Sequence, residues 1–171
     1  MYINLKGEPI IQDFDANVIE PSDNTYIVGV RKECKYMVYD LNGNLLDTYN
    51  FLRNNRSDDA IFAVKKGGKW GYIDGYGKVI IPLEYEEVGD FSEGLAAVVT
   101  ADTDKYGYIN TKGEMVIPPK YEKAFYFNEG VAAVQILDKW GYIDKRNQWV
   151  IPARYKSASN FEDGMARVSQ N

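Results

Sequence analysis

Large and small side chains alternate along three nearly identical stretches of this sequence. Residues 69–74 read Lys-Trp-Gly-Tyr-Ile-Asp, and the pattern returns at 105–110 and 139–144. Alternation with a period of two residues predicts a β-strand. An apolar triplet that ends in proline follows each stretch, at 80–82, 116–118 and 150–152. We expect a returning strand that ends at the proline, because proline cannot donate a hydrogen bond to a ladder.

A tight turn is predicted between these two strands. Asp or Asn is followed three residues later by Gly or Asn at 4–7, 40–43, 74–77, 110–113 and 144–147. The side chain of Asp or Asn can cap its own backbone, and only Gly and Asn readily adopt the left-handed conformation at the last position. A short apolar run, such as residues 95–99, predicts a third strand. The three strands form an antiparallel meander, and residues 85–94 cross over to the next one.

The meander recurs at a fixed spacing, which is typical of a repeat architecture. Tyr72, Tyr108 and Tyr142 are separated by 36 and 34 residues, and the same steps backwards reach Val38 and Tyr2. We therefore expect one all-β domain over 1–171, with five tandem units of about 35 residues. Their approximate limits are 1–30, 31–64, 65–100, 101–136 and 137–171, and the first two are degenerate.

Two architectures fit five such units. An open superhelical array is favoured, because propeller blades usually have four strands and about 40 residues or more. The alternative is a closed, propeller-like ring of five units. In the ring, residues 1–4 would pair with residues 165–168 and complete one meander from both termini.

Glycine recurs in the middle of the aromatic strand, at Gly71, Gly107 and Gly141. Glycine weakens a strand, so its repetition predicts close approach of another backbone or a neighbouring ring. The aromatic residue before it recurs as Trp70, Tyr106 and Trp140, and we expect it in the core between repeats. A lysine precedes each of these aromatic residues and can pair with the acidic residue that lies just before the glycine of the apolar run. The lysines are Lys69, Lys105 and Lys139, and the acidic residues are Glu93, Glu129 and Asp163.

Composition argues against catalysis and against several classes of ligand. The 171 residues include no histidine and one cysteine, so catalytic pairs with histidine and Cys/His zinc sites are excluded. No nucleotide-binding glycine motif occurs, and we expect no enzyme, cofactor or metal, nor any indicated small-molecule ligand. The net charge of −5 does not favour nucleic acid or membranes. Residues 1–64 carry 6 basic and 10 acidic residues, so most of this charge lies there.

The combined motif resembles the WG repeat of bacterial proteins. The elements are Lys-Trp-Gly-Tyr-Ile-Asp, then Gly-Lys-x-Val-Ile-Pro, Tyr, and Phe-x-x-Gly-x-Ala-x-Val. The resemblance is close over 65–171 and weak but in register over 1–64. It implies a repeat protein that mediates interactions, and it supplies no catalytic residues.

These observations favour a non-enzymatic scaffold that binds another protein. The second unit departs most from the pattern, and its aromatic and arginine residues are types enriched in binding hot spots. The candidates there are Tyr49, Phe51, Arg53 and Arg56. A carbohydrate or cell-envelope binder is the alternative, with Tyr76 and Trp149 as candidate stacking residues. A small acidic inhibitor or immunity-type protein is a weaker one. The lack of a signal peptide or membrane segment predicts a cytoplasmic protein.

Overall fold

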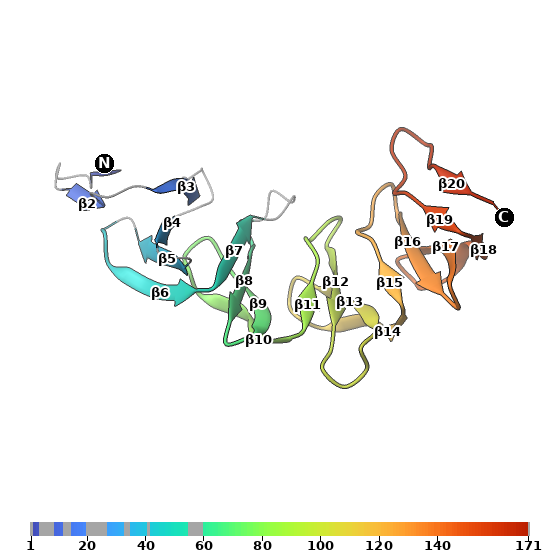
Figure 1. The fold of residues 1–171 in the computed structure, drawn as a ribbon, viewed down its shortest axis with the longest axis horizontal. Helices are drawn as coiled ribbons and strands as arrows, with labels where there is room; N and C mark the ends of the chain where they lie inside the picture. Colours follow the sequence, from blue (N-terminus) through green and yellow to red (C-terminus); the bar gives the residue numbers. More distant parts are fainter. Residues whose placement is uncertain are drawn as a thin grey trace. The chain divides into compact units, whose positions relative to one another are not determined.

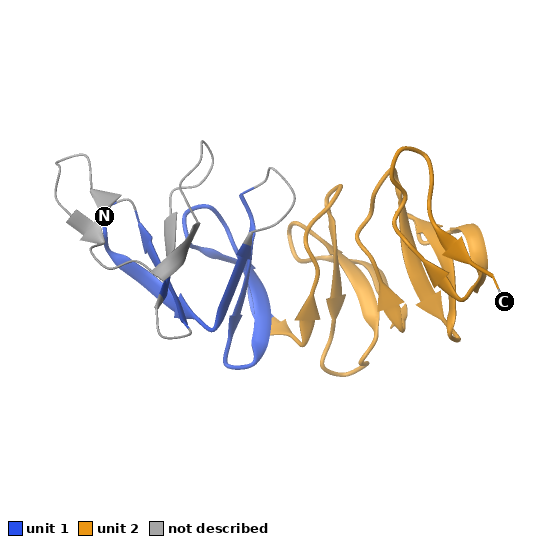
Figure 2. Cartoon of the chain, turned by 45° about the horizontal axis from the view of Figure 1, so that its top comes forward, with its two compact units in different colours: residues 1–83 blue, residues 84–171 orange. Residues whose placement is uncertain are grey.

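The computed structural model describes residues 2–3, 9–11, 15–19, 27–32, 35–40, 42–54 and 60–170. Every regular element in these residues is a β-strand, and every pairing between strands is antiparallel (Figure 1). No helix that could cross a membrane occurs among them. Contacts divide the chain into two compact units, Met1–Leu83 and Glu84–Asn171, which Figure 2 shows in blue and orange.

The first unit holds two four-stranded sheets and one two-stranded sheet. The two-stranded sheet pairs β1 (Tyr2–Ile3) with β2 (Pro9–Ile11). The next sheet contains β3 (Asp15–Ile19), β4 (Ile27–Lys32), β5 (Lys35–Asp40) and β6 (Leu45–Tyr49) in that order. The third contains β7 (Phe51–Asn54), β8 (Phe62–Lys66), β9 (Lys69–Ile73) and β10 (Val79–Tyr85), and the last two residues of β10 belong to the second unit.

The second unit repeats this organisation. One four-stranded sheet contains β11 (Glu87–Val88), β12 (Leu95–Val99), β13 (Tyr106–Asn110) and β14 (Met115–Tyr121). The next contains β15 (Lys123–Ala124), β16 (Val131–Ile136), β17 (Lys139–Asp144) and β18 (Trp149–Tyr155). A two-stranded sheet of β19 (Ser157–Ala158) and β20 (Val168–Ser169) follows.

The prediction of three strands per sheet is wrong for these larger sheets. The fourth strand comes from the segment that the sequence assigned to a crossover. In the second unit, the Glu86 N–H donates to Val99 O at 2.9 Å and the Gly89 N–H donates to Ala97 O at 2.7 Å. These bonds attach β11 to β12. A strand of two residues is too short to show alternation, so its sequence carries no strand signal.

The returning strands also run through their prolines instead of ending there. In β18, Pro152 lies inside a strand that continues to Tyr155. This strand is the last in its sheet order, and edge strands tolerate proline because their outer side makes no ladder bonds. The register between β17 and β18 also shifts, since Tyr142 faces Ile151 but Trp140 faces Tyr155. The proline therefore sits in a β-bulge on an edge strand.

The bulge confirms the predicted role of the mid-strand glycines as points of close backbone approach. A Cβ atom on Gly107 would lie 2.5 Å from Ile117 O and 2.8 Å from Pro119 N. On Gly71 and Gly141 the nearest backbone atom would lie at 2.6 Å. Real Cβ atoms do not approach backbone this closely. The bulged strand can therefore cross the middle strand only where the side chain is a hydrogen atom.

The predicted turns are confirmed within the described residues. Gly43, Gly77 and Gly113 have φ of 85°, 81° and 81°, and Asn147 has 63°. In the Asp74 turn, a side-chain oxygen accepts from the N–H groups of Tyr76 and Lys78, both at 2.9 Å. The requirement for positive φ explains why only Gly and Asn occupy the last position.

The core forms where successive sheets within a unit face one another. In the second unit, Tyr108 and Ile117 of one sheet pack with Phe127, Val134 and Ile143 of the next. The tyrosine two residues after the Trp or Tyr is the fully buried aromatic residue. This corrects the expectation for the first aromatic position, since only Trp140 is buried there and Trp70 and Tyr106 are half-buried.

Two of these buried tyrosines, Tyr108 and Tyr142, donate their hydroxyl hydrogen to a backbone carbonyl. Tyr108 Oη donates to Phe125 O at 2.7 Å, and Tyr142 Oη donates to Ser159 O at 2.9 Å. Both rings contact a phenylalanine edge-on, with centroids 4.9 Å apart: Tyr108 with Phe127, and Tyr142 with Phe161. Burial of rings of this size supplies much of the hydrophobic stabilisation, about 1.5–3 kcal/mol each.

The glycine constraint gives a first test. Gly107→Ala places a methyl group against backbone that cannot move aside, so the free energy of unfolding should fall by about 1–3 kcal/mol. Gly89→Ala is the matched control, because its Cβ atom would lie no closer than 3.4 Å to any neighbour. The control should change stability by less than about 1 kcal/mol. Equal urea unfolding midpoints for the two variants would contradict the close-approach explanation.

Candidate functional site

One candidate surface lies on the first unit and is centred on the ring of Trp70. Its members are Phe51, Arg53, Lys65 and Trp70, here called the Trp70 cluster. Strand register brings them together, because Phe51 faces Lys65 and Lys65 faces Trp70. The Phe51 and Trp70 ring centroids lie 6.0 Å apart. The Arg53 Cζ and Lys65 Nζ atoms lie 5.6 Å and 5.4 Å from the Trp70 centroid.

The chemistry of the Trp70 cluster is that of a contact surface. Phe51 is 55% exposed and Arg53 is exposed, while Trp70 and Lys65 are half-buried. Each of the two cations is attracted to the indole ring, with a cation–π energy of about 0.5–1 kcal/mol at exposed sites. The arrangement offers apolar area, positive charge and hydrogen-bond donors together, which is the combination found at binding hot spots.

Two of the predicted residues do not join this surface. Tyr49 is only 2% exposed and packs in the core with Val38 and Leu52. Burial, with the neighbouring Asp47 carboxylate, raises the pKa of Tyr49 to about 12. Tyr49 faces Tyr36 as Tyr121 faces Tyr106, so it is the regular tyrosine of its repeat. Arg56 lies outside the described residues.

The other two predicted residues are exposed. Tyr76 is 65% exposed in the turn between β9 and β10. Trp149 is 41% exposed at the start of β18, and its ring meets Tyr121 edge-on with centroids 6.2 Å apart. Tyr121 Oη donates to Asn147 Oδ1 at 2.6 Å, which ties the Trp149 turn to β14.

Trp149 belongs to a larger set that the sequence analysis did not single out. The last strand of each four-stranded sheet begins with exposed apolar side chains, here called the strand-start residues. They are Leu45 and Leu46 in β6, Val79 in β10, Met115 and Val116 in β14, and Trp149 and Val150 in β18. The sequence signal was present, since two consecutive apolar residues break the alternation expected of a half-exposed strand.

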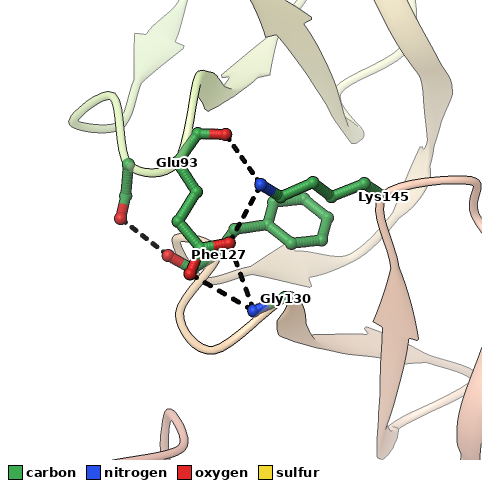
Figure 3. A network of polar contacts seen from close by, with 5 residues as sticks. Glu93, Phe127, Gly130 and Lys145 are labelled. Carbon is green, nitrogen blue, oxygen red and sulfur yellow. Dashed lines mark hydrogen bonds and ion pairs between the residues drawn. The ribbon is translucent and has the colours of Figure 1, made fainter.

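A second arrangement in the second unit links the turns of successive repeats (Figure 3). The Gly130 N–H lies 3.2 Å from both carboxylate oxygens of Glu93. Lys145 Nζ donates to the Glu93 carbonyl at 2.9 Å and lies 3.0 Å from its Oε2. Ser92 Oγ donates to Phe127 O at 2.7 Å. We call these contacts the turn ladder.

The turn ladder recurs one repeat later within the second unit, so it is a structural feature of the fold. There the Gly164 N–H donates to the Glu129 carboxylate at 3.0 Å, and Asn128 Nδ2 donates to Phe161 O at 2.7 Å. The sequence predicted that Glu93 pairs with one of the lysines that precede the aromatic residues, but Glu93 pairs with Lys145. Lys105 instead lies 3.8 Å from Glu122. Among the described residues, no group of three or more His, Cys, Asp or Glu side chains that could hold a metal ion occurs.

The turn ladder affects the titration of Glu93. Partial burial acts to raise the pKa of Glu93, but hydrogen bonds from Lys145 and the Gly130 N–H, with the lysine charge, outweigh it and lower that pKa. A group whose folded-state pKa is lowered stabilises the fold above its unfolded-state pKa. That contribution is lost as the pH falls through the folded-state value.

Glu93→Gln therefore tests the turn ladder. At neutral pH it should lower the free energy of unfolding by up to about 1 kcal/mol, and this difference should vanish in acid. Lys145→Met should give a similar loss, and the double variant should lose less than the sum. Glu129→Gln is the control, because its effect should add to that of Lys145→Met. Additive effects of Glu93→Gln and Lys145→Met would show that the contact contributes nothing.

Comparison with known families agrees with this geometry. The model of the WG containing repeat matches residues 70–102, 106–140 and 140–171, which together cover more than half of the chain. Each matched segment includes an aromatic–glycine strand, its bulged partner strand and a turn of the phenylalanine–glycine type. A comparison with curated proteins gives no match. The chain therefore belongs to the WG containing repeat family.

Proposed function

We propose that this protein is a non-enzymatic scaffold that binds another protein through its strand-start residues. The observation that carries the proposal is their recurrence: the same strand position exposes apolar side chains in four successive sheets. These side chains are 40–53% exposed, so about half of the surface of each stays in contact with water and adds nothing to the hydrophobic stabilisation of the fold. Exposed apolar surface larger than a scattered single residue usually marks a site of interaction, and β6, β14 and β18 each begin with two adjacent exposed apolar residues.

The chemistry of these side chains favours a protein partner over a carbohydrate. Six of the seven strand-start residues are Leu, Val or Met, which lack the broad flat ring on which a sugar stacks. Trp149 is the exception. The repeated tyrosines Tyr72, Tyr108 and Tyr142 are at most 1% exposed and cannot be reached by a sugar. The Trp70 cluster adds a basic and aromatic contact of the kind that a protein hot spot uses.

We further propose that the repeats form one open superhelical array of five units. The regular spacing of the motif and the repetition of the turn ladder within the second unit support this arrangement. An open array displays equivalent side chains at regular intervals, so a partner can contact several repeats at once.

A double substitution tests the binding surface. Val116→Ser with Val150→Ser removes two exposed methyl-bearing side chains and should leave the unfolding midpoint unchanged. Binding of a partner captured from the source organism should weaken at least about tenfold, or about 1.4 kcal/mol. Leu137→Ser is the matched control, because Leu137 is exposed but lies in a turn away from the strand starts. Equal capture by all three proteins would exclude the strand-start residues.

Small-angle scattering tests the open array separately. A compact protein of this length has a radius of gyration of about 15.5 Å. An open array of five units should exceed that value by several ångströms at the lowest usable concentration. A radius of gyration near the compact value would contradict the open array, and it would leave the binding test unaffected.

A further inference from the structure

Successive sheets carry different charges around the first aromatic residue of the repeat. A row of three facing residues ends at this aromatic residue in each sheet: Phe51, Lys65 and Trp70; Glu87, Val99 and Tyr106; and Lys123, Gln135 and Trp140. The middle residue is charged in the first of these rows and neutral in the other two. Two positions after the start of each row, the residue is Arg53, Gly89 or Phe125. The Trp70 row therefore has cations at two positions that are neutral around Tyr106 and Trp140.

The next sheet shows which group the repeat places beside this aromatic residue. There Glu87 stands at the position of Phe51, and Tyr106 Oη donates a hydrogen bond to its Oε2 atom. A carboxylate of the same chain thus lies beside the aromatic residue in that row. In the Trp70 row the chain has a phenyl ring at this position and cations at the two neighbouring ones. A carboxylate from another molecule is the complementary group for these cations.

The Trp70 cluster holds its two cations beside an apolar surface. The Arg53 Cζ and Lys65 Nζ atoms lie 5.6 Å and 5.4 Å from the Trp70 ring centroid. A guanidinium can rest one face on a ring and still bind a carboxylate with two parallel hydrogen bonds. Phe51, which is 55% exposed, adds an apolar ring 6.0 Å from the indole centroid. The cluster therefore suits a segment in which acidic side chains flank an apolar one.

The hairpin of β8 and β9 adds positive charge beside the cluster. Lys66 faces Lys69 where the hairpin turns, and like charges directly opposite each other cost stability. Asp47 lies 2.6 Å from Lys66 Nζ and offsets part of that cost. Residues 47–70 contain five basic and three acidic residues, in a chain whose net charge is −5. An acidic partner is attracted to this segment and repelled by the chain as a whole, so charge directs it to the Trp70 cluster.

The same surface is less suited to a nucleic acid. A single strand is bound along a positively charged groove that follows several phosphates, with aromatic rings for successive bases. The net charge of −5 opposes the approach of such a long polyanion. A short acidic segment of a protein needs only the Trp70 cluster.

We propose that the Trp70 cluster binds an extended acidic segment of a partner protein. Arg53 and Lys65 bind carboxylates of the segment, and Phe51 and Trp70 contact an apolar side chain between them. This inference rests on the proposed binding of a protein partner, and it names the chemistry of one segment that the partner supplies. The contact is distinct from the strand-start residues, which are apolar.

A pair of labelled peptides tests the proposal on the unmodified protein. The probe is fluorescein-Glu-Glu-Phe-Glu-Glu, and the matched control is fluorescein-Gln-Gln-Phe-Gln-Gln, which keeps the apolar residue without the charges. In fluorescence anisotropy at about 20 mM NaCl, the acidic peptide should bind at least about tenfold more tightly than the neutral one. At about 0.5 M NaCl most of this difference should disappear, because salt screens exposed charges. Equal binding of the two peptides, or binding of neither, would overturn the proposal.

Arg53→Gln with Lys65→Gln tests whether the peptide binds at the Trp70 cluster. This double variant should bind the acidic peptide at least about fivefold more weakly than wild type. Lys112→Gln with Lys156→Gln is the matched control, because it removes the same charge from exposed positions of the second unit. The control should bind as wild type does, and an equal loss in both double variants would overturn the proposal. If the first double variant does not fold, Phe51→Ser gives the same test, since it removes an exposed ring of the cluster and should also weaken binding.

Two further measurements separate this proposal from its neighbours. A fluorescein-labelled oligothymidylate of about ten nucleotides should bind more weakly than the acidic peptide, and tighter binding would overturn the proposal in favour of a nucleic acid. Val116→Ser with Val150→Ser should bind the acidic peptide as wild type does. A negative result for the strand-start residues therefore leaves the peptide result standing, and a negative peptide result leaves the partner-capture test standing.

Discussion

Glycine has no Cβ atom, and its presence in the aromatic strand allows the last strand of each repeat to cross directly over that strand. At Gly107 and Gly141 the bulged strand passes so close that a methyl group would overlap backbone atoms. The crossing shifts the register, so that Tyr121 and Tyr155 face Tyr106 and Trp140. The regular tyrosine is thereby buried. The bulge, the proline and the glycine form one unit, which explains why they recur together.

Sequence alone predicted the parts of the fold that single residues dictate. The turn at Asn147 and the close approach at Gly141 each follow from one backbone requirement, and both were found. The fourth strand was missed because Glu87 and Val88 pair through backbone groups, whatever their side chains are. The turn ladder was missed for a similar reason. Its acceptor, Glu93, binds a backbone N–H 37 residues away, and no residue pattern records that contact.

The candidate surface was predicted in part, and its error has a physical origin. Phe51 and Arg53 are exposed and lie beside Trp70, as residues two apart on one face of a strand must. Tyr49 was grouped with them because it is an aromatic residue in the repeat that departs most from the pattern. Its cross-strand partner Tyr36 shows that it holds the regular buried position. In a degenerate repeat, the sequence does not show which residue holds which repeat position, and the strand pairing identifies it.

The repeat frame leaves some surface positions free to vary, and the residues found at these positions bear on the proposed binding of a partner. The residues just before the strand starts are exposed and differ in charge: Lys78, Glu114 and Gln148. The next positions are also exposed, yet they are apolar in every four-stranded sheet, from Leu45 to Trp149. Core packing alone does not dictate apolar residues here, because each of these side chains is at least 40% exposed. Their size and shape vary while their apolar character does not, as expected if each repeat presents a distinct contact of one general kind to a partner.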